Sequence, residues 1–232
     1  ASDKPELTIA SYQLVGSLIC IILAIWLPFP NALSWPMIIA SVLVHNLYYF
    51  ALAQAYRSGD LSQVYPIFRG TAPILVACGA AIFADEYLPL AKVAGIIFIS
   101  LAIISLAFNT TKFGKMSPKA IFWATSTAVL IAGYTIIDGI GVRISKNPLS
   151  YIVWLFILEV VPIGIILLLN KRSEWANYLL ETRWKVFAGG IASSAAYGLV
   201  IYAMSLGAIA IVSSLRETSV IFAAVIGALW LR

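Results

Sequence analysis

Long apolar runs alternate with short polar breaks along almost the whole chain, and the breaks contain Pro, Asn, Gly or clusters of charge. Runs of this length predict membrane-spanning helices, because a helix needs about 20 apolar residues to cross a hydrocarbon core of ~30 Å. Eight spans are predicted, at 9–28, 35–56, 62–84, 88–108, 118–142, 149–170, 184–205 and 208–231. The predicted fold class is an all-α integral membrane protein.

Composition agrees with this pattern. Of the 232 residues, 62% are hydrophobic and 11% are charged, whereas soluble domains contain roughly 25% charged residues. The net charge of +5 does not indicate a nucleic-acid partner, because the cations lie mainly in short loops. Cys20 and Cys78 lie inside apolar runs and His45 is the single histidine, so we predict no metal site and no cofactor.

Two spans share an unusual design, in which an arginine and a threonine precede a run of small and apolar residues. The first pair is Arg69 and Thr71, and the second is Arg216 and Thr218. A charge inside a membrane span is tolerated mainly where it faces a polar cavity or a partner, so both arginines are candidate functional residues. Such a duplication is typical of transporters built from two repeats.

The two halves of the chain align around this design. Three matched pairs carry the alignment, with a one-residue slip before the last: Tyr49 with Tyr197, Gly59 with Gly207, and Arg69 with Arg216. We therefore predict two repeats, at 1–110 and 111–232. Each resembles four-fifths of a five-helix unit, so we expect eight helices of a ten-helix protein, with the first and last helices missing. An odd number of helices in each repeat predicts that the two repeats have opposite orientations in the membrane.

These motifs resemble those of the drug/metabolite transporter superfamily, in particular its EamA-type permeases. The resemblance rests on residues 48–66, on YTIIDGIGVR at 134–143, and on LRETS at 215–219. The second-half motifs are most similar to a subgroup of membrane proteins associated with phosphonate utilisation. The resemblance implies an inverted-repeat helical bundle with a central cavity, alternating access, export or exchange of small metabolites, and a location in the bacterial inner membrane.

The two arginines have two interpretations. As a pair of guanidinium groups they would bind the carboxylate or phosphonate of an anionic substrate, since their fork geometry matches such groups. As structural groups they would instead form an ion pair between the repeats, with Glu217 or Asp138 as the carboxylate, or extend to a nearby membrane surface.

Three carboxyl groups are candidates for coupling to protons. Asp138, near the end of its span, could bind a proton or hold Arg216, while helix-end pairing with Arg143 is the structural alternative. Glu159 lies midway along an apolar span and must face the bundle, either for proton coupling or for a structural hydrogen bond. Glu217 follows Arg216 directly.

Two further sites are predicted to be structural. Asp85 and Glu86 are interpreted as a solvated helix end, with a contact to the other repeat as the alternative. Gly189 and Gly190 are interpreted as sites of close helix packing.

Aromatic residues complete the predicted substrate site. Several could line a cavity, although aromatic rings also form belts at membrane interfaces. The candidates for substrate contact are Tyr65, Tyr134, Tyr49, His45 and Tyr197, together with Arg69, Arg216 and Asp138. His45 and Tyr49 share one helix face because they are four residues apart.

These features favour a secondary transporter of a small anionic or zwitterionic metabolite, with the lipid bilayer and protons as further partners and a homodimer allowed. A membrane-embedded enzyme is a weaker alternative, because the chain has one histidine and no predicted intramembrane lysine. A structural subunit without transport activity is the third alternative, and it would not need an intramembrane arginine in each half.

Overall fold

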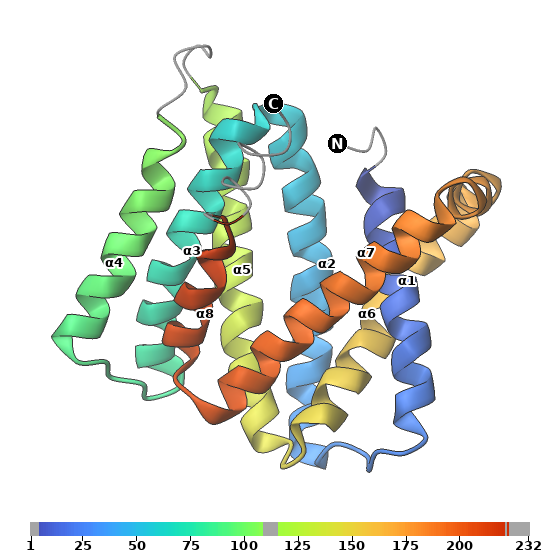
Figure 1. The fold of residues 1–232 in the computed structure, drawn as a ribbon, viewed down its shortest axis with the longest axis horizontal. Helices are drawn as coiled ribbons and strands as arrows, with labels where there is room; N and C mark the ends of the chain where they lie inside the picture. Colours follow the sequence, from blue (N-terminus) through green and yellow to red (C-terminus); the bar gives the residue numbers. More distant parts are fainter. Residues whose placement is uncertain (1–4, 109–115, 221, 223–232) are drawn as a thin grey trace. The chain divides into compact units, whose positions relative to one another are not determined.

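A computed structural model describes residues 5–108, 116–220 and 222. The described residues form α-helices joined by short turns, with one 3-10 helix at Ala32–Ser34 (Figure 1). The helices are α1 (Pro5–Ala24), α2 (Trp35–Ser58), α3 (Leu61–Phe83), α4 (Leu90–Ser105), α5 (Pro118–Ile144), α6 (Pro148–Asn170), α7 (Arg172–Leu206) and α8 (Ile209–Glu217).

Six helices within the described residues are long and apolar enough to cross a membrane: α1, α2, α3, α5, α6 and α7. The prediction of an all-α, multi-pass membrane protein is therefore confirmed at this level. Helix α4 has 16 residues and reaches only about 24 Å at 1.5 Å per residue, which is less than a ~30 Å core. Most of the predicted span 208–231 lies outside the described residues.

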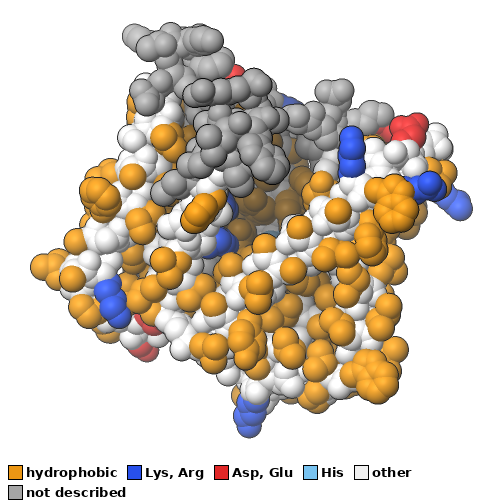
Figure 2. Space-filling view, viewed as in Figure 1, with side chains coloured by type: hydrophobic (Ala, Val, Ile, Leu, Met, Phe, Trp, Pro, Cys, Tyr) orange, Lys and Arg blue, Asp and Glu red, His pale blue; other side chains and the backbone are white. Residues whose placement is uncertain are grey.

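Helix α7 is longer than the predicted span 184–205, because it begins at Arg172. Its 35 residues extend about 52 Å, more than the membrane core requires. The early segment is too polar for a membrane span, and hydropathy therefore missed it. It is helical because it packs on α1, where Trp175 is buried and its Nε1 donates to Ser11 Oγ at 2.9 Å. Lysine and arginine side chains lie at this end of α7, while hydrophobic side chains cover the remainder of its visible face (Figure 2).

The first predicted span, 9–28, lies about one turn too late in the chain. Helix α1 begins at Pro5, a residue favoured in the first turn because its missing N–H needs no helical partner there. It ends at Ala24, ahead of Pro28 and Pro30. Proline restricts the conformation of the preceding residue and cannot donate a helical hydrogen bond, so the helix ends here although the apolar run continues.

The chain forms two compact units that interleave its halves. Unit 1 comprises residues 1–53 and 137–206, and unit 2 comprises residues 54–136 and 207–232. The helices that carry the aligned arginines, α3 and α8, pack together in unit 2, and α1 packs against α6 in unit 1. The division into repeats at 1–110 and 111–232 remains a prediction.

In unit 1, α1 packs against α6 and α7 around Leu7, Ala10, Leu167 and Trp175. Gly190 allows the close approach of α7, because a Cβ there would lie 2.7 Å from Val15 Cβ. The packing interpretation of this glycine is confirmed.

In unit 2, α3 packs against α4 and α8, and Val64 meets Ala120 and Ala124. Gly70 is needed for the contact of α3 with α4, since a Cβ there would lie 2.9 Å from the Ser100 carbonyl oxygen. This close contact lies directly beside Arg69 in the sequence, so the packing of α4 helps to position that arginine.

Candidate functional site

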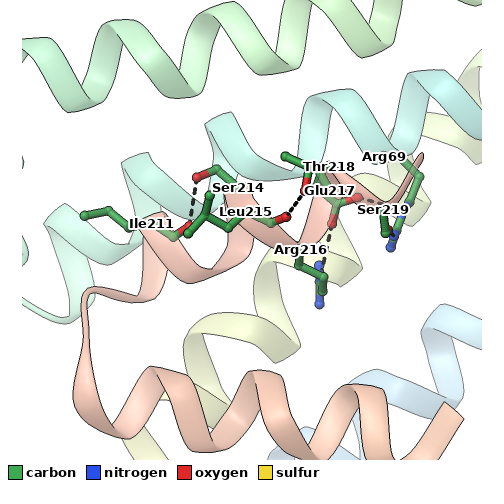
Figure 3. Close-up of polar contacts among 8 residues, drawn as sticks. All are labelled: Arg69, Ile211, Ser214, Leu215, Arg216, Glu217, Thr218 and Ser219. Atoms are coloured by element: carbon green, nitrogen blue, oxygen red, sulfur yellow. Dashed lines mark hydrogen bonds and ion pairs between the residues drawn. The ribbon is translucent and has the colours of Figure 1, made fainter. Parts of the chain in front are cut away.

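Unit 2 contains an arginine cluster, which we define as Arg69, Arg216 and Glu217. Arg69 Nε lies 2.7 Å from Glu217 Oε2, and Arg216 Nε donates to Glu217 Oε1 at 3.0 Å. Figure 3 shows the side chains of both arginines reaching this one carboxylate. Arg69 also donates to Ser219 Oγ at 3.3 Å, and its Cζ lies 5.7 Å from the Tyr65 ring centroid. Arginines at matched positions of α3 and α8 thus share one carboxylate.

The two contacts to Glu217 differ in geometry. Arg216 forms an aligned hydrogen bond, whereas the Arg69 N–H does not point at Oε2 despite the short distance. Arg69 therefore holds Glu217 by charge, and its buried Nε–H has no aligned acceptor. The Glu217 side chain is fully buried, while 18% of the Arg69 side chain and 11% of the Arg216 side chain are exposed. The carboxylate is thus buried more deeply than the two arginine side chains that contact it.

Both arginines lie where their helices are weakened. Pro73 lies four residues after Arg69 in α3, so the Arg69 carbonyl loses its helical N–H donor. Regular helix in α8 ends at Glu217, and Thr218 forms a turn in which its Oγ1 donates to the Leu215 carbonyl at 2.7 Å. Hydroxyl groups that bond to nearby carbonyls compete with helical hydrogen bonds. Interrupted membrane helices of this kind are common at transporter binding sites.

The other end of α8 is held by a distant carboxylate. The N-cap residue, Ala208, has no side chain that can cap the helix, and Glu86 Oε2 instead accepts from the Ile209 N–H at 2.8 Å. A carboxylate at this position also complements the positive end of the helix dipole. Glu86 is therefore not simply a solvated helix end, because it contacts a segment from the second half of the chain, as the alternative interpretation expected. This contact fixes the helix that carries Arg216 and Glu217.

Unit 1 contains a carboxyl cluster, which we define as Ser41, His45, Tyr49, Asp138, Tyr151, Glu159 and Tyr197. At its centre, Asp138 is fully buried. Its Oδ1 accepts from the Tyr151 hydroxyl at 2.9 Å and its Oδ2 accepts from the Tyr197 hydroxyl at 2.5 Å. Two tyrosine hydroxyl groups from two helices, α6 and α7, thus hold one carboxyl of α5.

Gly141 explains how Tyr151 reaches Asp138. It lies almost one turn after Asp138 on α5, and a Cβ there would lie 2.6 Å from the Tyr151 hydroxyl oxygen. Only glycine leaves room for the tyrosine ring across this face of α5. The helix continues to Ile144, so Gly141 provides close approach rather than a break. Arg143 Nε donates to the Met204 carbonyl at 3.0 Å.

The second carboxyl of this cluster is also buried and also held by a tyrosine. Glu159 Oε1 accepts from the Tyr49 hydroxyl at 2.7 Å. Asn46 lies about one turn before Tyr49 on α2, and its Nδ2 donates to the Glu159 backbone carbonyl at 3.4 Å. The two tyrosines that the sequence alignment pairs, Tyr49 and Tyr197, therefore each donate to a buried carboxyl.

His45 lies between these two tyrosines. Its ring centroid is 5.4 Å from that of Tyr197 and 6.3 Å from that of Tyr49. Its Nδ1 lies 3.0 Å from the Ser41 carbonyl oxygen and 3.1 Å from Ser41 Oγ. The histidine is buried, so it belongs to the interior of unit 1.

Neither the family models nor the curated proteins contain a match to this chain. The interpretation of its chemistry therefore depends on the two clusters.

The structure distributes the predicted site residues between the units. Tyr65 joins the arginine cluster, whereas His45, Tyr49, Asp138, Glu159 and Tyr197 meet in the carboxyl cluster. Tyr134 lies buried on α5 in unit 2. The prediction that Arg69, Arg216 and Asp138 approach a single cavity involves both units and remains a prediction.

Ser41 and Tyr151 belong to the carboxyl cluster but were not among the predicted site residues. Ser41 extends the face of His45 and Tyr49 by one more turn, and Tyr151 lies two turns before Glu159 on one face of α6. These spacings can be read from the sequence, but they do not show which neighbouring helix each face contacts. Ser and Tyr are also common in membrane helices and at interfaces, so the residue types alone do not indicate a site.

Proposed function

We propose that this chain is an EamA-type secondary transporter of the drug/metabolite transporter superfamily, which moves a small anionic or zwitterionic organic metabolite across the bacterial inner membrane. The observation that carries the proposal is the arginine cluster, in which two guanidinium groups share one buried carboxylate. In this proposal Arg69 and Arg216 bind the acidic group of the substrate. Alternating access then moves the bound substrate across the membrane.

The energetic cost of the cluster supports a functional role. An arginine or aspartate near the centre of a membrane helix costs about 2.5–3.5 kcal/mol on insertion scales. Helix association in a membrane does not require such charges, because small residues and van der Waals packing can drive it. Gly70 already provides that packing between α3 and α4. Three clustered charges therefore favour a binding role.

The partial exposure of the two arginines also supports the proposal. Of their side chains, 18% is exposed for Arg69 and 11% for Arg216. A carboxylate or phosphonate oxygen could accept from N–H groups of these two forks. Glu217 then acts as the resident anion, which occupies the arginines when substrate is absent and competes with it. This exchange makes Glu217, with Asp138 and Glu159, a candidate coupling group.

The arrangement of repeats supports the proposed fold. The helices that carry the aligned arginines, α3 and α8, pack together in unit 2. A pseudo-two-fold relation between two inverted repeats would produce such a pair. The matched arginines and the matched tyrosines then take up equivalent roles within each unit.

The test is transport by the full chain in proteoliposomes. A thermal-shift screen of monocarboxylates, dicarboxylates, amino acids and alkylphosphonates would select a solute, and its labelled form would be used for flux. We expect Arg69→Ala and Arg216→Ala to weaken solute binding about 30-fold or more, because removing one partner of a desolvated charged pair costs about 2–5 kcal/mol. Lysine at either position should restore it partly, since lysine lacks the fork.

Arg57→Ala is the matched control, because Arg57 is an exposed arginine at the end of α2 in the same unit. It should transport at the wild-type rate. Wild-type flux in both Arg69→Ala and Arg216→Ala, with membrane insertion intact, would refute the proposed binding site. The absence of flux for every solute class in the wild-type protein would refute transport of this kind.

A further inference from the structure

The early turns of α7 lie across α1 rather than along it. Trp175 Nε1 donates to Ser11 Oγ at 2.9 Å, and Gly189 packs against the ring of Tyr12. Positions 175 and 189 are 14 residues apart, about 21 Å along a helix, yet their partners on α1 are neighbours in the sequence. Figure 1 agrees, since it shows α1 lengthwise and the first turns of α7 nearly end-on.

This crossing lies at one end of the membrane-spanning part of unit 1. Leu7 packs with α7 in the buried cluster there, and α1 ends at Ala24, about 26 Å further along its axis. Beyond that other end, the Trp154 ring lies 5.1 Å from the Phe29 ring and 5.3 Å from the Trp35 ring, measured between centroids. Such aromatic groups gather at membrane interfaces. The early part of α7 therefore lies at the opposite boundary of the hydrocarbon core, close to the membrane plane.

One side of this segment carries an exposed apolar stripe. Leu180, Trp184 and Phe187 share a helix face because they are four and three residues apart, and 71% of Leu180 and 74% of Trp184 are exposed. The stripe continues to Ile191, which is exposed on the apolar part of the helix. The bilayer covers that part of α7, so the continuity of the stripe identifies lipid as its occupant.

The charges of the segment are sorted onto two opposite edges. Arg172 and Arg183 are 11 residues apart, about three turns, and share a basic edge. Glu174 and Glu181 are seven residues apart, about two turns, and share an acidic edge. Glu174 and Arg183 are nine residues apart, about two and a half turns, which places the two edges on opposite sides of the helix.

Arg183 connects the basic edge to the apolar stripe. Its Cζ lies 6.0 Å from the Trp184 ring centroid. The guanidinium fork matches the oxygens of a phosphate, and tryptophan rings favour the level of lipid headgroups. Lys185 lies on the other side of Trp184, one turn after Glu181, where a lysine can pair with that carboxylate.

We propose that residues 172–187 of α7 form an interfacial segment that binds anionic phospholipids. The segment inserts its apolar stripe into the leaflet, as amphipathic helices in the membrane plane do. Arg172 and Arg183 bind the phosphate groups of the headgroups, and the acidic edge faces water. The partner is a lipid rather than a free anion, because the basic edge adjoins the inserted side chains. This surface does not depend on transport activity.

The depth of Trp184 is the first test. The full chain would be produced with fluorinated tryptophan, placed in nanodiscs of phosphatidylcholine and phosphatidylglycerol, and followed by fluorine NMR. The Trp184 signal is the one lost in Trp184→Phe. A spin label near the top of the lipid acyl chain should broaden it more than a label at the chain end or a paramagnetic chelate in water. Strongest broadening by either of the other two agents overturns the interfacial position.

The choice of lipid is the second test. Spin-labelled phosphatidylglycerol and spin-labelled phosphatidylcholine would be compared at equal mole fraction, and the ratio of the broadening that they cause at Trp184 measures the local preference. We expect a ratio of about three or more in the wild type, because basic residues near a membrane surface attract anionic lipids. A wild-type ratio of one overturns anionic lipid binding.

Variants on the two edges identify the binding residues. Arg183→Ala should bring the ratio toward one, and Arg172→Ala should lower it as well and serves if the first variant does not fold. Lys185→Ala is the matched control, since it removes the same charge from the other side of Trp184, and it should keep most of the preference. Equal losses in Arg183→Ala and Lys185→Ala overturn the assignment of the basic edge.

Discussion

The two clusters hold the same chemical group in opposite ways. In unit 2, Glu217 is held by two guanidinium groups, which remain charged at every physiological pH. In unit 1, Asp138 and Glu159 are held by tyrosine hydroxyl groups, and the His45 ring lies close to two of these tyrosines. The first arrangement pairs a carboxylate with cations, and the second pairs carboxyl groups with neutral donors.

This difference concerns the partners that each cluster offers to a charged group. Guanidinium groups bind an anion in a fork geometry, so the arginine cluster matches acidic groups. The carboxyl cluster holds its carboxyl groups through neutral tyrosine hydroxyl groups. Each cluster lies within one compact unit, so each can be altered separately.

The largest expected effect is a difference in stability between variants of the two clusters. Glu217→Gln removes the anion that both guanidinium groups contact, and we expect it to cost about 3–5 kcal/mol. Asp138→Asn keeps an acceptor for some of its hydroxyl partners, so its cost should be about 1–3 kcal/mol. Denaturation midpoints of the full chain in one detergent would measure both, and equal losses would contradict the comparison.

Glu181→Gln is the control for that pair, since Glu181 is exposed on α7 and should change stability by less than about 0.5 kcal/mol. A chemical rescue sharpens the result. Excess acetate should raise the midpoint of Glu217→Gln, because a small anion can replace the lost carboxylate, and should leave Asp138→Asn unchanged.

The second prediction concerns the packing that builds the carboxyl cluster. Gly141→Ala should destabilise the chain by about 1–3 kcal/mol, because the new methyl group displaces Tyr151 from Asp138. Gly95→Ala is the matched control, since no atom lies within 4 Å of a Cβ at that position. The control should be neutral or stabilising by up to about 1 kcal/mol, through helix propensity alone. A stable Gly141→Ala variant would show that Tyr151 does not depend on this glycine.

A carboxylate outside the membrane spans provides a third environment. Asp60 caps α3, with its Oδ1 accepting from Ser62 N at 2.8 Å and from Ser62 Oγ at 2.6 Å. Asp60→Ala should cost about 1 kcal/mol, and Asp60→Asn should cost less because asparagine also caps helices.

The Ser62 hydrogen bonds, the side-chain bond first, lower the pKa of Asp60 below its ordinary value of 3.8. A group with a lowered folded-state pKa stabilises the protein above its unfolded pKa, and the contribution is lost as the pH falls through the folded value. The stability of the wild type should therefore fall relative to that of Asp60→Asn as the pH drops below about 4, and the difference between the two should stay constant above it. A difference that still changes with pH between about 5 and 7 would contradict the assignment to Asp60.

The smallest expected effects are those of the matched tyrosines. Tyr49→Phe and Tyr197→Phe each remove one hydrogen bond, and such bonds in membrane proteins contribute about 0.6 kcal/mol on average. Because they bond different carboxyls, the double variant should lose the sum. A coupling energy above about 0.5 kcal/mol in the double-mutant cycle would show that Asp138 and Glu159 act as one site.

The sequence alone determined the helical, multi-pass character of this protein and most of its chemical candidates. Apolar run length is a local property, so α2, α3, α5 and α6 lie close to their predicted ranges. The charges of Arg69, Arg216 and Glu159 stood out because polar groups are expensive in a bilayer. The boundaries of α1 and α7 were less predictable, since proline geometry and packing on a neighbour decide them.

Only the tertiary structure decided which of these groups meet. Glu217 is shared by arginines that are 147 positions apart, 69 and 216, and Tyr197 reaches Asp138 from a different helix. Helical periodicity indicates which residues share a face, but not which neighbour that face contacts. Glu86 illustrates this limit, because a carboxylate at a helix end appears solvated in sequence and caps another helix in the folded chain. Contacts between distant segments depend on the packing of whole helices, which no local pattern contains.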